Sequence, residues 1–485
     1  MTQETFDVTI IGAGAVGTAL ARELTRYQLD VLVLEASDDV AAGATRANSG
    51  IVHGGYAAKA GTRKAEFCRP GNRMFPRLAA ELDFPYRATG SVVLCFSEGD
   101  EAALERLYAN GVSNGVDDLE LCSRDETLRR IPRLNPAEVH GGLFCAGAGI
   151  VSPYEYAIAM MENAIVNGAR LRLESPVTAL SHIGERIALE AGGREYSTRI
   201  LVNAAGVGAE GVAALAGSPP FRMKPRKGQY ILLRRGTAEG LDTVVFQPPN
   251  ENGKGILVTP TTWGNLMLGP DAQEIQDQSD TGTDPESLAR IIRTARRSVK
   301  DFDVKQAIRV FSGTRPAADR GDFIIEWSET IPGMLHMAGI ESPGLTASPA
   351  LALEAVRLLG EAGLSLRKRP DFQPLRRAPT RPAPLGPPAQ AAKRAQLPEG
   401  DPERIVCRCE QVSEATVRDA LERGIPLRST DGVKRRTRAG MGACQGAFCG
   451  PRVRKLVADF GGIDADNVLG PSRNRDRIKA DLDAT

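Results

Sequence analysis

A glycine-rich turn near the N-terminus constrains the fold of this chain more than any other sequence feature. Gly12, Gly14 and Gly17 form the pattern G-x-G-x-x-G. The turn follows an apolar run typical of a buried strand (8–11), and a helix-forming stretch and a second apolar run (31–34) come after it. This order predicts a β-α-β unit and therefore a parallel sheet in an α/β fold.

The same turn predicts a dinucleotide site. Gly12 permits the tight turn, Gly14 lets a pyrophosphate approach the backbone, and Gly17 allows the helix to pack closely on the strand. The helix N-terminus would face the phosphates with its partial positive charge. Glu35 ends the second strand and would accept hydrogen bonds from ribose hydroxyls. The alternative is a glycine turn without a ligand, and the complete strand–turn–helix–strand context argues against it.

The choice between FAD and NAD depends on the segment that follows Glu35. Residues 43–55 are rich in small and polar side chains, which could lie along the diphosphate and ribityl chain of an extended flavin cofactor. We therefore expect FAD, and we take four residues of this segment as cofactor-binding: Thr45, Asn48, Ser49 and Gly50.

On these residues the chain resembles the D-amino-acid oxidase-like superfamily of FAD enzymes, which includes glycerol-3-phosphate dehydrogenase and L-2-hydroxyglutarate dehydrogenase. The resemblance covers about residues 5–360, and the segments 48–56 and 64–68 look most like the 2-hydroxyglutarate branch. Other superfamily-like pieces recur in order at 149–153, 202–206, 227–230, 312–316 and 338–350.

The resemblance implies a Rossmann-like FAD-binding domain interleaved with an antiparallel-sheet substrate domain. β-rich runs at 230–233, 255–258 and 266–268 agree with such a sheet. It also implies further FAD contacts, from Val177, Gly206, Gly339, Gly344, Leu345 and Thr346.

The segment 339–346 precedes a predicted helix, which we place at Pro349–Leu359 with Ser348 as the N-cap. Its backbone amides would face the flavin pyrimidine and stabilise the reduced, anionic flavin. Glycerol-3-phosphate dehydrogenases usually have a Gly-Gly-Lys-Leu-type run here. The present sequence looks closer to the 2-hydroxyglutarate branch, which puts a phosphorylated substrate in doubt.

Two side chains are candidates for the chemistry. Oxidation of an alcohol requires removal of its hydroxyl proton, a task suited to histidine, and His53 lies in the segment expected to face the flavin. A structural hydrogen-bonding role for His53 is the alternative. Arg315, in Ser-Gly-Thr-Arg-Pro, is the expected clamp for a substrate carboxylate or phosphate. Related enzymes use an arginine of this motif in that way. Arg320 and Lys227 are weaker candidates, more typical of surface or structural ion pairs.

Four of the eight cysteines are clustered near the C-terminus: Cys407, Cys409, Cys444 and Cys449. In a reducing compartment, clustered cysteines are typical of metal sites rather than disulfides. The pattern C-x-C…C-x4-C resembles the bacterioferritin-associated ferredoxin-like [2Fe-2S] domain. The segment 435–446 looks like the C-terminal part of the catalytic chain of anaerobic glycerol-3-phosphate dehydrogenase. We expect a [2Fe-2S] cluster; zinc and unligated thiols are the alternatives. Cys68, Cys95, Cys122 and Cys145 are expected to be buried or incidental.

Composition changes sharply between the large body and the cysteine-rich module. A Pro-rich stretch at 366–402 is predicted to be a semi-rigid linker. The predicted FAD-binding domain is discontinuous and consists of residues 1–75, 145–215 and 325–365. The predicted substrate domain consists of residues 76–144 and 216–324. The linker (366–402) is followed by a [2Fe-2S] domain (403–460) and by a tail that could be a charged helix (461–485).

Charge and hydropathy exclude several classes of protein. The net charge is +1 with Lys and Arg spread along the chain, which argues against a nucleic-acid-binding stripe. No apolar run approaches the roughly 20 residues of a membrane span. The first strand begins too early for a signal peptide, so we expect a cytoplasmic protein. Association with a membrane surface stays open.

These features predict an FAD-dependent dehydrogenase that transfers hydride from a small anionic secondary alcohol to flavin. The [2Fe-2S] cluster would then pass single electrons to a partner protein or another subunit. The iron–sulfur module favours glycerol 3-phosphate as substrate, and the flavin-proximal loops favour L-2-hydroxyglutarate. Two alternatives remain: an amine or imino-acid dehydrogenase or oxidase of the same fold, and a non-catalytic electron-transfer component of a larger complex.

Overall fold

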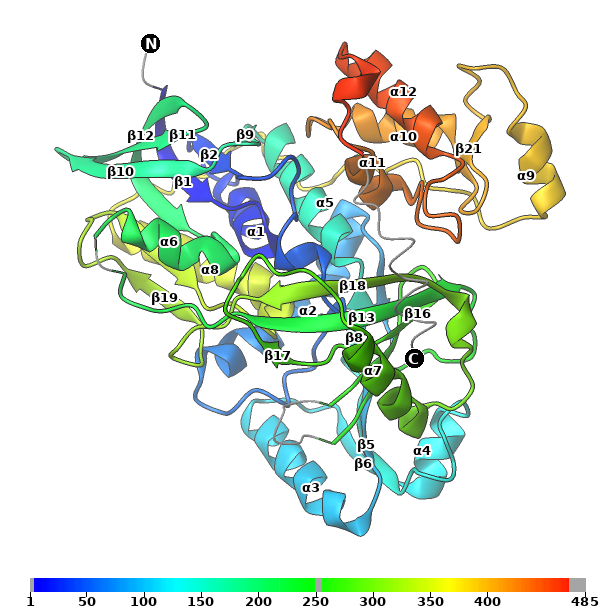
Figure 1. The fold of residues 1–485 in the computed structure, drawn as a ribbon. Coiled ribbons are helices and arrows are strands. Elements are labelled where there is room, and N and C mark those ends of the chain that lie inside the picture. The colour runs from blue at the N-terminus through cyan, green and yellow to red at the C-terminus, as the bar shows by residue number, and fades with distance from the viewer. Residues whose placement is uncertain (1–3, 218, 249–254, 471–485) are drawn as a thin grey trace.

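The computed structural model describes residues 4–217, 219–248 and 255–470. The body of the molecule has two sheet layers, and a small helical module lies beside them (Figure 1). The first sheet has a parallel core in the order β9-β2-β1-β12-β20, and the antiparallel strands β10, β11 and β19 extend it. Its strands are β1 (Glu4–Ile11), β2 (Val31–Leu34), β9 (Arg170–Arg172), β10 (Val177–Ile183), β11 (Arg186–Ala191), β12 (Arg194–Asn203), β19 (Ile324–Trp327) and β20 (Met334–Ala338).

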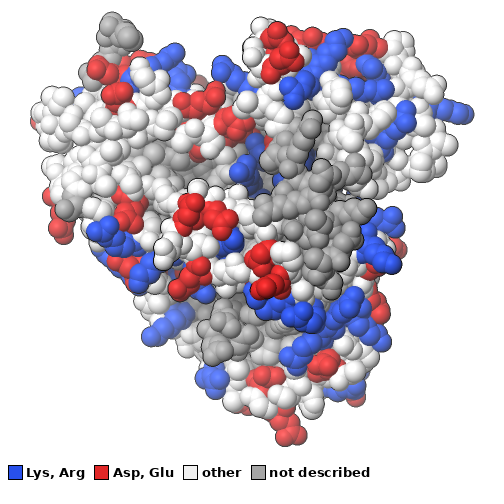
Figure 2. Space-filling model, viewed as in Figure 1, with Lys and Arg blue, Asp and Glu red and all other residues white. Residues whose placement is uncertain are grey.

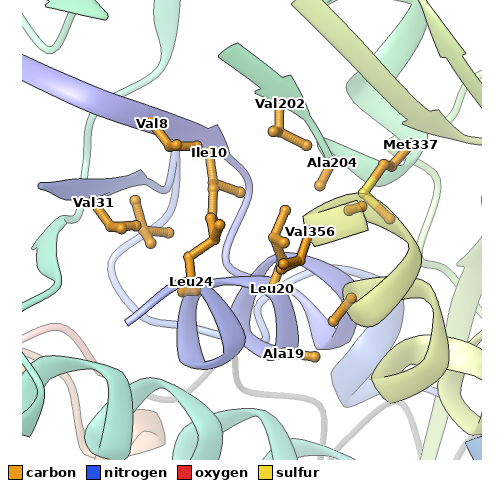
Figure 3. Close-up of a cluster of buried hydrophobic side chains, with 14 of the residues drawn as sticks. Val8, Ile10, Ala19, Leu20, Leu24, Val31, Val202, Ala204, Met337 and Val356 are labelled. Carbon is orange, nitrogen blue, oxygen red and sulfur yellow. The ribbon is translucent and has the colours of Figure 1, made fainter. Parts of the chain in front are cut away.

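Helices cover one face of this sheet and bury the main core against it. The helices are α1 (Ala15–Leu24), α5 (Pro153–Val166), α8 (Gly344–Glu361) and α2 (Arg63–Leu82), which packs on α8. Figure 3 shows Val8 and Ile10 of β1 pointing toward Leu20 of α1, with Val356 of α8 beside them. Strands buried on both faces read as near-continuous apolar runs, which is why the β-α-β unit is predictable from sequence.

The second layer is a mainly antiparallel sheet in the order β17-β13-β16-β15-β14-β5-β7-β6, with β18 on the other side of β13. One pair, β14 with β5, is parallel. Its strands are β5 (Ser91–Cys95), β6 (Leu119–Ser123), β7 (Gly141–Cys145), β13 (Arg226–Arg235), β14 (Val244–Phe246), β15 (Val258–Pro260), β16 (Asn265–Leu268), β17 (Gln273–Glu274) and β18 (Ala307–Arg315).

Shorter elements complete the body. A small sheet of β3 (Ile51–Val52), β8 (Gly149–Val151) and β4 (Tyr86–Ala88) bridges the two layers. The remaining helices of the body are α3 (Glu98–Ser113), α4 (Arg124–Arg130), α6 (Ala209–Ala214) and α7 (Pro285–Ser298), and its 3-10 turns are η1 (Ala44–Arg46), η2 (Gly206–Gly208) and η3 (Val304–Gln306). The predicted domain boundary at 75–76 falls inside α2, because that helix continues to pack on α8.

The helix predicted at 349–359 begins earlier than its sequence indicates. α8 starts at Gly344 and contains Pro349 in its second turn. Pro349 has no N–H for the carbonyl of Leu345, but the hydroxyl of Ser348 donates to that oxygen at 2.8 Å. Ser348 is therefore not an N-cap, and its hydroxyl lets the helix begin before the proline.

The C-terminal module has its own core around Val412, Val433 and Val457. Its elements are β21 (Ile405–Cys407), β22 (Val412–Ser413), α10 (Glu414–Leu421), α11 (Thr430–Thr437), α12 (Gly450–Gly461) and η4 (Ala465–Asn467). The helical tail expected within 461–485 lies outside the described residues from 471 onward. Within the described ranges, every helix is too short or too polar to cross a membrane.

The Pro-rich segment 366–402 is attached to the body rather than extended in solvent. The amide of Gln373 donates to Asn167 at 2.7 Å, and Arg376 pairs with the buried Glu162 at 2.7 Å. Arg381 pairs with Asp83 at 2.8 Å, and α9 (Pro388–Arg394) follows. Composition predicts a semi-rigid linker because such a segment cannot bury a core of its own. Side-chain hydrogen bonds hold it in place instead.

Candidate functional site

A cavity of about 1240 Å³ lies between the two layers of the body. Its walls are the turn after β1, the segment 42–51, the facing ends of β13 and β18, and the N-terminus of α8. Ordinary small-molecule pockets enclose about 300–1,000 Å³, so this cavity suits a ligand of dinucleotide size together with a small substrate.

The glycine turn forms one end of the cavity, and its geometry requires glycine. A Cβ on Gly12 would lie 2.5 Å from the carbonyl oxygen of Ala204, and one on Gly17 would lie 2.0 Å from that of Gly12. Gly12 also has a φ of +104°, which side chains rarely adopt. Gly14 caps α1 without a side-chain hydrogen bond, and apart from the Ala15 amide, which donates to Thr45, the amides of the first turn can serve an anion.

Glu35, residues of η1 and the residues after it line the same end. The Glu35 carboxylate accepts hydrogen bonds from the amides of Ala13 at 2.8 Å and Ser37 at 2.9 Å. Thr45 Oγ1 accepts from the amide of Ala15 at 3.0 Å, directly at the start of α1. Ser49 and Gly50 line the cavity with them. The structure therefore brings these predicted FAD contacts together.

Asn48 organises this segment from within. Its amide group donates to the carbonyl of Thr45 at 2.8 Å, and its carbonyl accepts from the amide of Gly50 at 2.8 Å. Gly50 has a φ of +65°, and a Cβ there would lie 2.4 Å from the oxygen of Val151. The backbone can run this close to β8 only with glycine, which fixes the wall of the cavity.

At the other end of the cavity, His53 lies beside the start of α8. Its amide donates to Thr346 Oγ1 at 2.9 Å, and its Nε2 lies 3.3 Å from the hydroxyl of Ser342. Thr346 Oγ1 in turn donates to the carbonyl of Ile51 at 3.2 Å. The ring of His53 lies 5.9 Å from that of Phe246. His53 thus sits on the cavity wall with a hydroxyl neighbour that can orient its imidazole.

Gly344 and Leu345 line this end, where α8 directs its first amides. Gly339 is not among the lining residues of the described chain, but its neighbours Ala338 and Ile340 are. Gly206 lines the cavity at the start of η2. Val177 does not: its strand pairs with β11 at the sheet edge and its side chain packs against an apolar cluster. The predicted Val177 contact is therefore not supported by the geometry.

Arg315 ends β18 and faces the cavity from the second layer. Its Nη2 donates to the backbone carbonyl of Asp271 at 2.8 Å. Arg226 of β13 stands opposite Arg315 in the strand register and also lines the cavity. The buried Asp271 carboxylate pairs with Arg290 at 2.9 Å, so it does not neutralise the other two arginines directly. Besides Arg290, whose charge is paired with Asp271, two guanidiniums therefore face one end of the cavity.

Sequence reasoning missed Arg226, Asp271 and Arg290. Arg226 directly precedes the superfamily-like segment 227–230, but only the β13–β18 register shows that it stands opposite Arg315. Tyr230 of that segment stacks on Phe311 at 4.8 Å. Burial raises the pKa of the Tyr230 hydroxyl, and the nearby Arg315 opposes this shift. The two weaker candidates are paired elsewhere: Lys227 with Asp280 at 2.6 Å and Arg320 with Glu326 at 2.7 Å.

The four C-terminal cysteines come together in the module. The thiols of Cys407 and Cys449 interact with each other, as do those of Cys409 and Cys444. In the described residues, no three His, Cys, Asp or Glu side chains surround a single-ion site. Thiols arranged in two pairs suit a binuclear [2Fe-2S] cluster, which takes four thiolates over two irons, better than one tetrahedral zinc.

Backbone amides support these thiols. The amides of Gly440 and Glu410 donate to the sulfur of Cys407, and the amide of Cys444 donates to that of Cys409. The interaction with Cys449 holds the pKa of the Cys407 thiol at about 6, and thiolate is the form that binds metal. A Cβ on Gly442 would lie 2.3 Å from Cβ of Cys409, so glycine is needed there. The donor set therefore fits the predicted cluster.

The other four cysteines are buried in the body, as expected. Burial raises the pKa of Cys145 to about 12, which keeps its thiol protonated and unreactive.

Buried ion pairs fix the module against the body. Asp39, just after β2, accepts from Arg435 at 2.7 Å and from Arg436 at 2.8 Å, and its side chain is fully buried. Burial by itself raises the pKa of Asp39, but the attraction of Arg436 and Arg435 outweighs it and holds the pKa at about 2. Asp39 follows Glu35 closely, so the module docks near the dinucleotide end of the cavity.

A second contact lies around Trp263. The indole N–H donates to Glu155 at 2.9 Å, and the guanidinium of Arg438 lies 4.9 Å from the ring. Arg438 also pairs with Glu410 at 2.8 Å, next to Cys409. The thiol site is thereby tied to both layers of the body.

This combination of a dinucleotide cavity and a four-cysteine module defines a class of protein. The chain belongs to the family of FAD dependent oxidoreductases, whose model matches residues 7–358. A second model, the BFD-like [2Fe-2S] binding domain, matches residues 405–459. The protein is therefore an FAD-dependent oxidoreductase with a C-terminal [2Fe-2S] domain, and the predicted fold class and cofactors are confirmed.

The chain is also similar to individual proteins. The chain is 38% identical to a glycerol 3-phosphate dehydrogenase of Caloramator mitchellensis, over 96% of both chains. It is 27% identical to one of the subunits of the anaerobic glycerol-3-phosphate dehydrogenase of Escherichia coli K12, over 94% of this chain and 88% of the relative. Among solved structures, the dithionite-reduced, FAD-bound L-α-glycerophosphate oxidase of Mycoplasma pneumoniae matches with a TM-score of 0.74 and 29% identity. That match covers 78% of this chain and all of the oxidase.

Proposed function

We propose that this protein oxidises glycerol 3-phosphate at its secondary alcohol, giving the corresponding ketone phosphate, and passes the electrons to a partner protein. The observation that carries the proposal is the 38% identity to a glycerol 3-phosphate dehydrogenase over 96% of both chains. The cavity agrees with a doubly charged substrate, because Arg226 and Arg315 both face it. These features outweigh the loop resemblance to the 2-hydroxyglutarate branch.

The chain's residues take the following roles in this proposal. Arg315 and Arg226 bind the phosphate and so place the secondary alcohol toward His53. His53 accepts the hydroxyl proton as the carbon gives up its hydrogen with two electrons, and Ser342 orients the imidazole. The amides at the start of α8 favour negative charge at that end of the cavity. When bound, FAD supplies a two-electron acceptor and the [2Fe-2S] cluster a one-electron exit.

The substrate is tested by anaerobic stopped-flow mixing of the holoenzyme with glycerol 3-phosphate, L-2-hydroxyglutarate or proline. We expect glycerol 3-phosphate to bleach the flavin absorbance within the turnover time and the cluster absorbance to follow. Bleaching by L-2-hydroxyglutarate alone would move the substrate to the 2-hydroxy acids, and bleaching by proline alone would move it to the imino acids.

The clamp is tested by Arg315→Ala. Loss of a charge-assisted contact to a desolvated phosphate costs about 2–5 kcal/mol, a fall of roughly 30- to 4,000-fold in kcat/KM. Arg320→Ala is the matched control, since Arg320 pairs with Glu326 at the surface, and it should change kcat/KM little. Equal effects of the two variants would contradict the assignment of Arg315.

His53→Ala tests the proposed base. Removal of a general base lowers kcat by about 10²- to 10⁴-fold while the flavin content stays unchanged. A variant with normal kcat would leave His53 with only a structural role.

A further inference from the structure

The thiol site of the module is closed on one side and open on the other. Cys407 and Cys449 are buried, whereas Cys409 and Cys444 are partly exposed. The surface around the partly exposed thiols is called the exit face here. It consists of Arg408, Cys409, Ala443, Cys444, Ala447, Phe448 and Arg452.

The exit face combines a small apolar centre with two cations. The guanidinium of Arg408 lies 4.1 Å from the centre of the Phe448 ring, and that of Arg452 lies 4.6 Å from it. Ala447 is exposed beside this ring. A flat ring held by two guanidiniums next to a redox centre is a rigid contact surface with positive charge at its rim.

The cations of the exit face differ from most other arginines of the module, although Arg454 also lacks an acidic partner among the described residues and donates to the carbonyls of Ala465 and Val468. Arg435, Arg436 and Arg438 are paired with Asp39 and Glu410. Arg404 and Arg418 share the carboxylate of Glu414. In the part of the chain that the structure describes, Arg408 and Arg452 have no salt bridge, and Arg452 donates to the carbonyl of Ile405. Two positive charges without an acidic partner are thus concentrated at the exposed thiols.

Another part of the module is already occupied by the body. α11 and the turn after it dock on Asp39, Trp263 and Asn265 of the body. A cluster held by the four thiols would therefore be reached from solvent at Cys409 and Cys444, on the exit face. The net charge of the whole chain is +1, and both signs intermix over the face shown in Figure 2. Because the net charge is close to zero, a charged partner must be attracted and oriented by a local patch of charge rather than by the electrostatic field of the whole protein.

We infer that the exit face is the docking site of an acidic redox protein, which receives electrons from the cluster and is held by Arg408 and Arg452 around Phe448. This inference rests on the proposed electron transfer to a partner. Complementary charge of this kind raises association rates and fixes orientation more than it raises affinity, as suits a carrier that must leave again.

The test uses one redox protein in two charge forms as the probe. The holoenzyme is reduced with glycerol 3-phosphate, or with dithionite followed by desalting, and mixed with native cytochrome c, which is cationic, or with its succinylated, anionic form. We expect the succinylated form to oxidise the enzyme at least tenfold faster at low salt, with an advantage that falls steeply as ionic strength rises. A faster reaction with the native form would overturn the inference.

Variants locate the effect. Arg408→Glu should slow the reaction with succinylated cytochrome c about tenfold, and Arg452→Gln should slow it less. Iron content and the rate of cluster reduction by glycerol 3-phosphate should stay unchanged in both. Arg106→Glu is the matched control, because Arg106 is exposed on α3, at the far end of the molecule from the module (Figure 1). An equal loss in Arg106→Glu would contradict a local docking site.

Two further outcomes separate the inference from its alternatives. Sedimentation of the protein with phosphatidylglycerol vesicles that is abolished by Arg408→Glu would assign the exit face to a lipid surface and overturn the proposal. If glycerol 3-phosphate fails to reduce the enzyme while dithionite-reduced enzyme still shows the charge preference, the proposed substrate is wrong and the docking site stands.

Discussion

The cavity of the body and the thiol site of the module are both shaped by glycines and backbone amides, yet they are held in different ways. The cavity is backed by the large apolar cluster between the first sheet and α1, α5 and α8. The module has one small core that includes Cys407 and Cys449 themselves. It is fixed to the body by buried ion pairs. The cavity is thus preformed by packing, whereas the module depends on its ligands and on its docking.

The largest effect is expected from Gly17→Val. A Cβ at Gly17 would lie 2.0 Å from the Gly12 carbonyl oxygen, so α1 must move away from the turn and the diphosphate site is lost. We expect purified protein without FAD, measured by flavin absorbance. Gly211→Ala is the control, since Gly211 is exposed in α6 away from the cavity lining and a Cβ there meets no atom within 4 Å, so this variant should keep FAD. If Gly17→Val retained FAD, the glycine turn would not be what fixes the dinucleotide.

Cys449→Ser should disrupt the module while the cavity of the body stays intact. Serine is a poor ligand for iron, so the cluster is lost and the module, whose core contains Cys449, loses hydrogen-exchange protection over 405–459. FAD content and flavin reduction by glycerol 3-phosphate should persist. Cys122→Ser, at a buried cysteine of the body, should leave the iron content unchanged. A normal cluster in Cys449→Ser would remove Cys449 from the ligand set.

Asp39→Asn tests the docking of the module. Removing the charge leaves Arg435 and Arg436 buried without their anion, which costs about 3–5 kcal/mol at the interface. Hydrogen exchange should rise in α11, and electron transfer from flavin to cluster should slow. The folded pKa of about 2 is depressed, so this stabilisation is fully present above the ordinary aspartate pKa of about 4 and fades as the pH falls toward 2. Unchanged exchange in α11 would show that other contacts hold the module.

Trp263→Phe should have the smallest effect. Phenylalanine keeps a ring for Arg438 but loses the indole hydrogen bond to the buried Glu155, at a cost of about 1–3 kcal/mol. Thermal unfolding should show a modest fall in melting temperature with FAD and iron contents unchanged. A loss of cluster in this variant would indicate that Trp263 supports the thiol site itself.

Local patterns predict much of the architecture. The β-α-β unit and the position of the flavin-facing segment depend on residues close together in sequence, and both lie where the pattern places them. The register of β13 against β18 is not local, so sequence reasoning does not place Arg226 beside Arg315. The pairing of Asp39 with Arg435, 396 residues later, has no sequence signal either.

The errors have definite causes. The predicted start of α8 is wrong because a proline usually opens a helix, and only the structure shows the Ser348 hydroxyl replacing the missing N–H. The semi-rigid linker is a prediction from composition, which does not report that Arg376 has a buried partner in Glu162. In both cases a side-chain hydrogen bond gives a structure that differs from the one predicted from the sequence.

The contacts that hold the segment 366–402 on the body also set the effective concentration of the module at its binding site on the body. Because the segment is fixed at Gln373, Arg376 and Arg381, only a short stretch of chain before β21 tethers the module to the body. Short tethers give millimolar effective concentrations, so the module stays bound to the body even if the interface between them is weak. A carrier must therefore reach the cluster while the module remains in place.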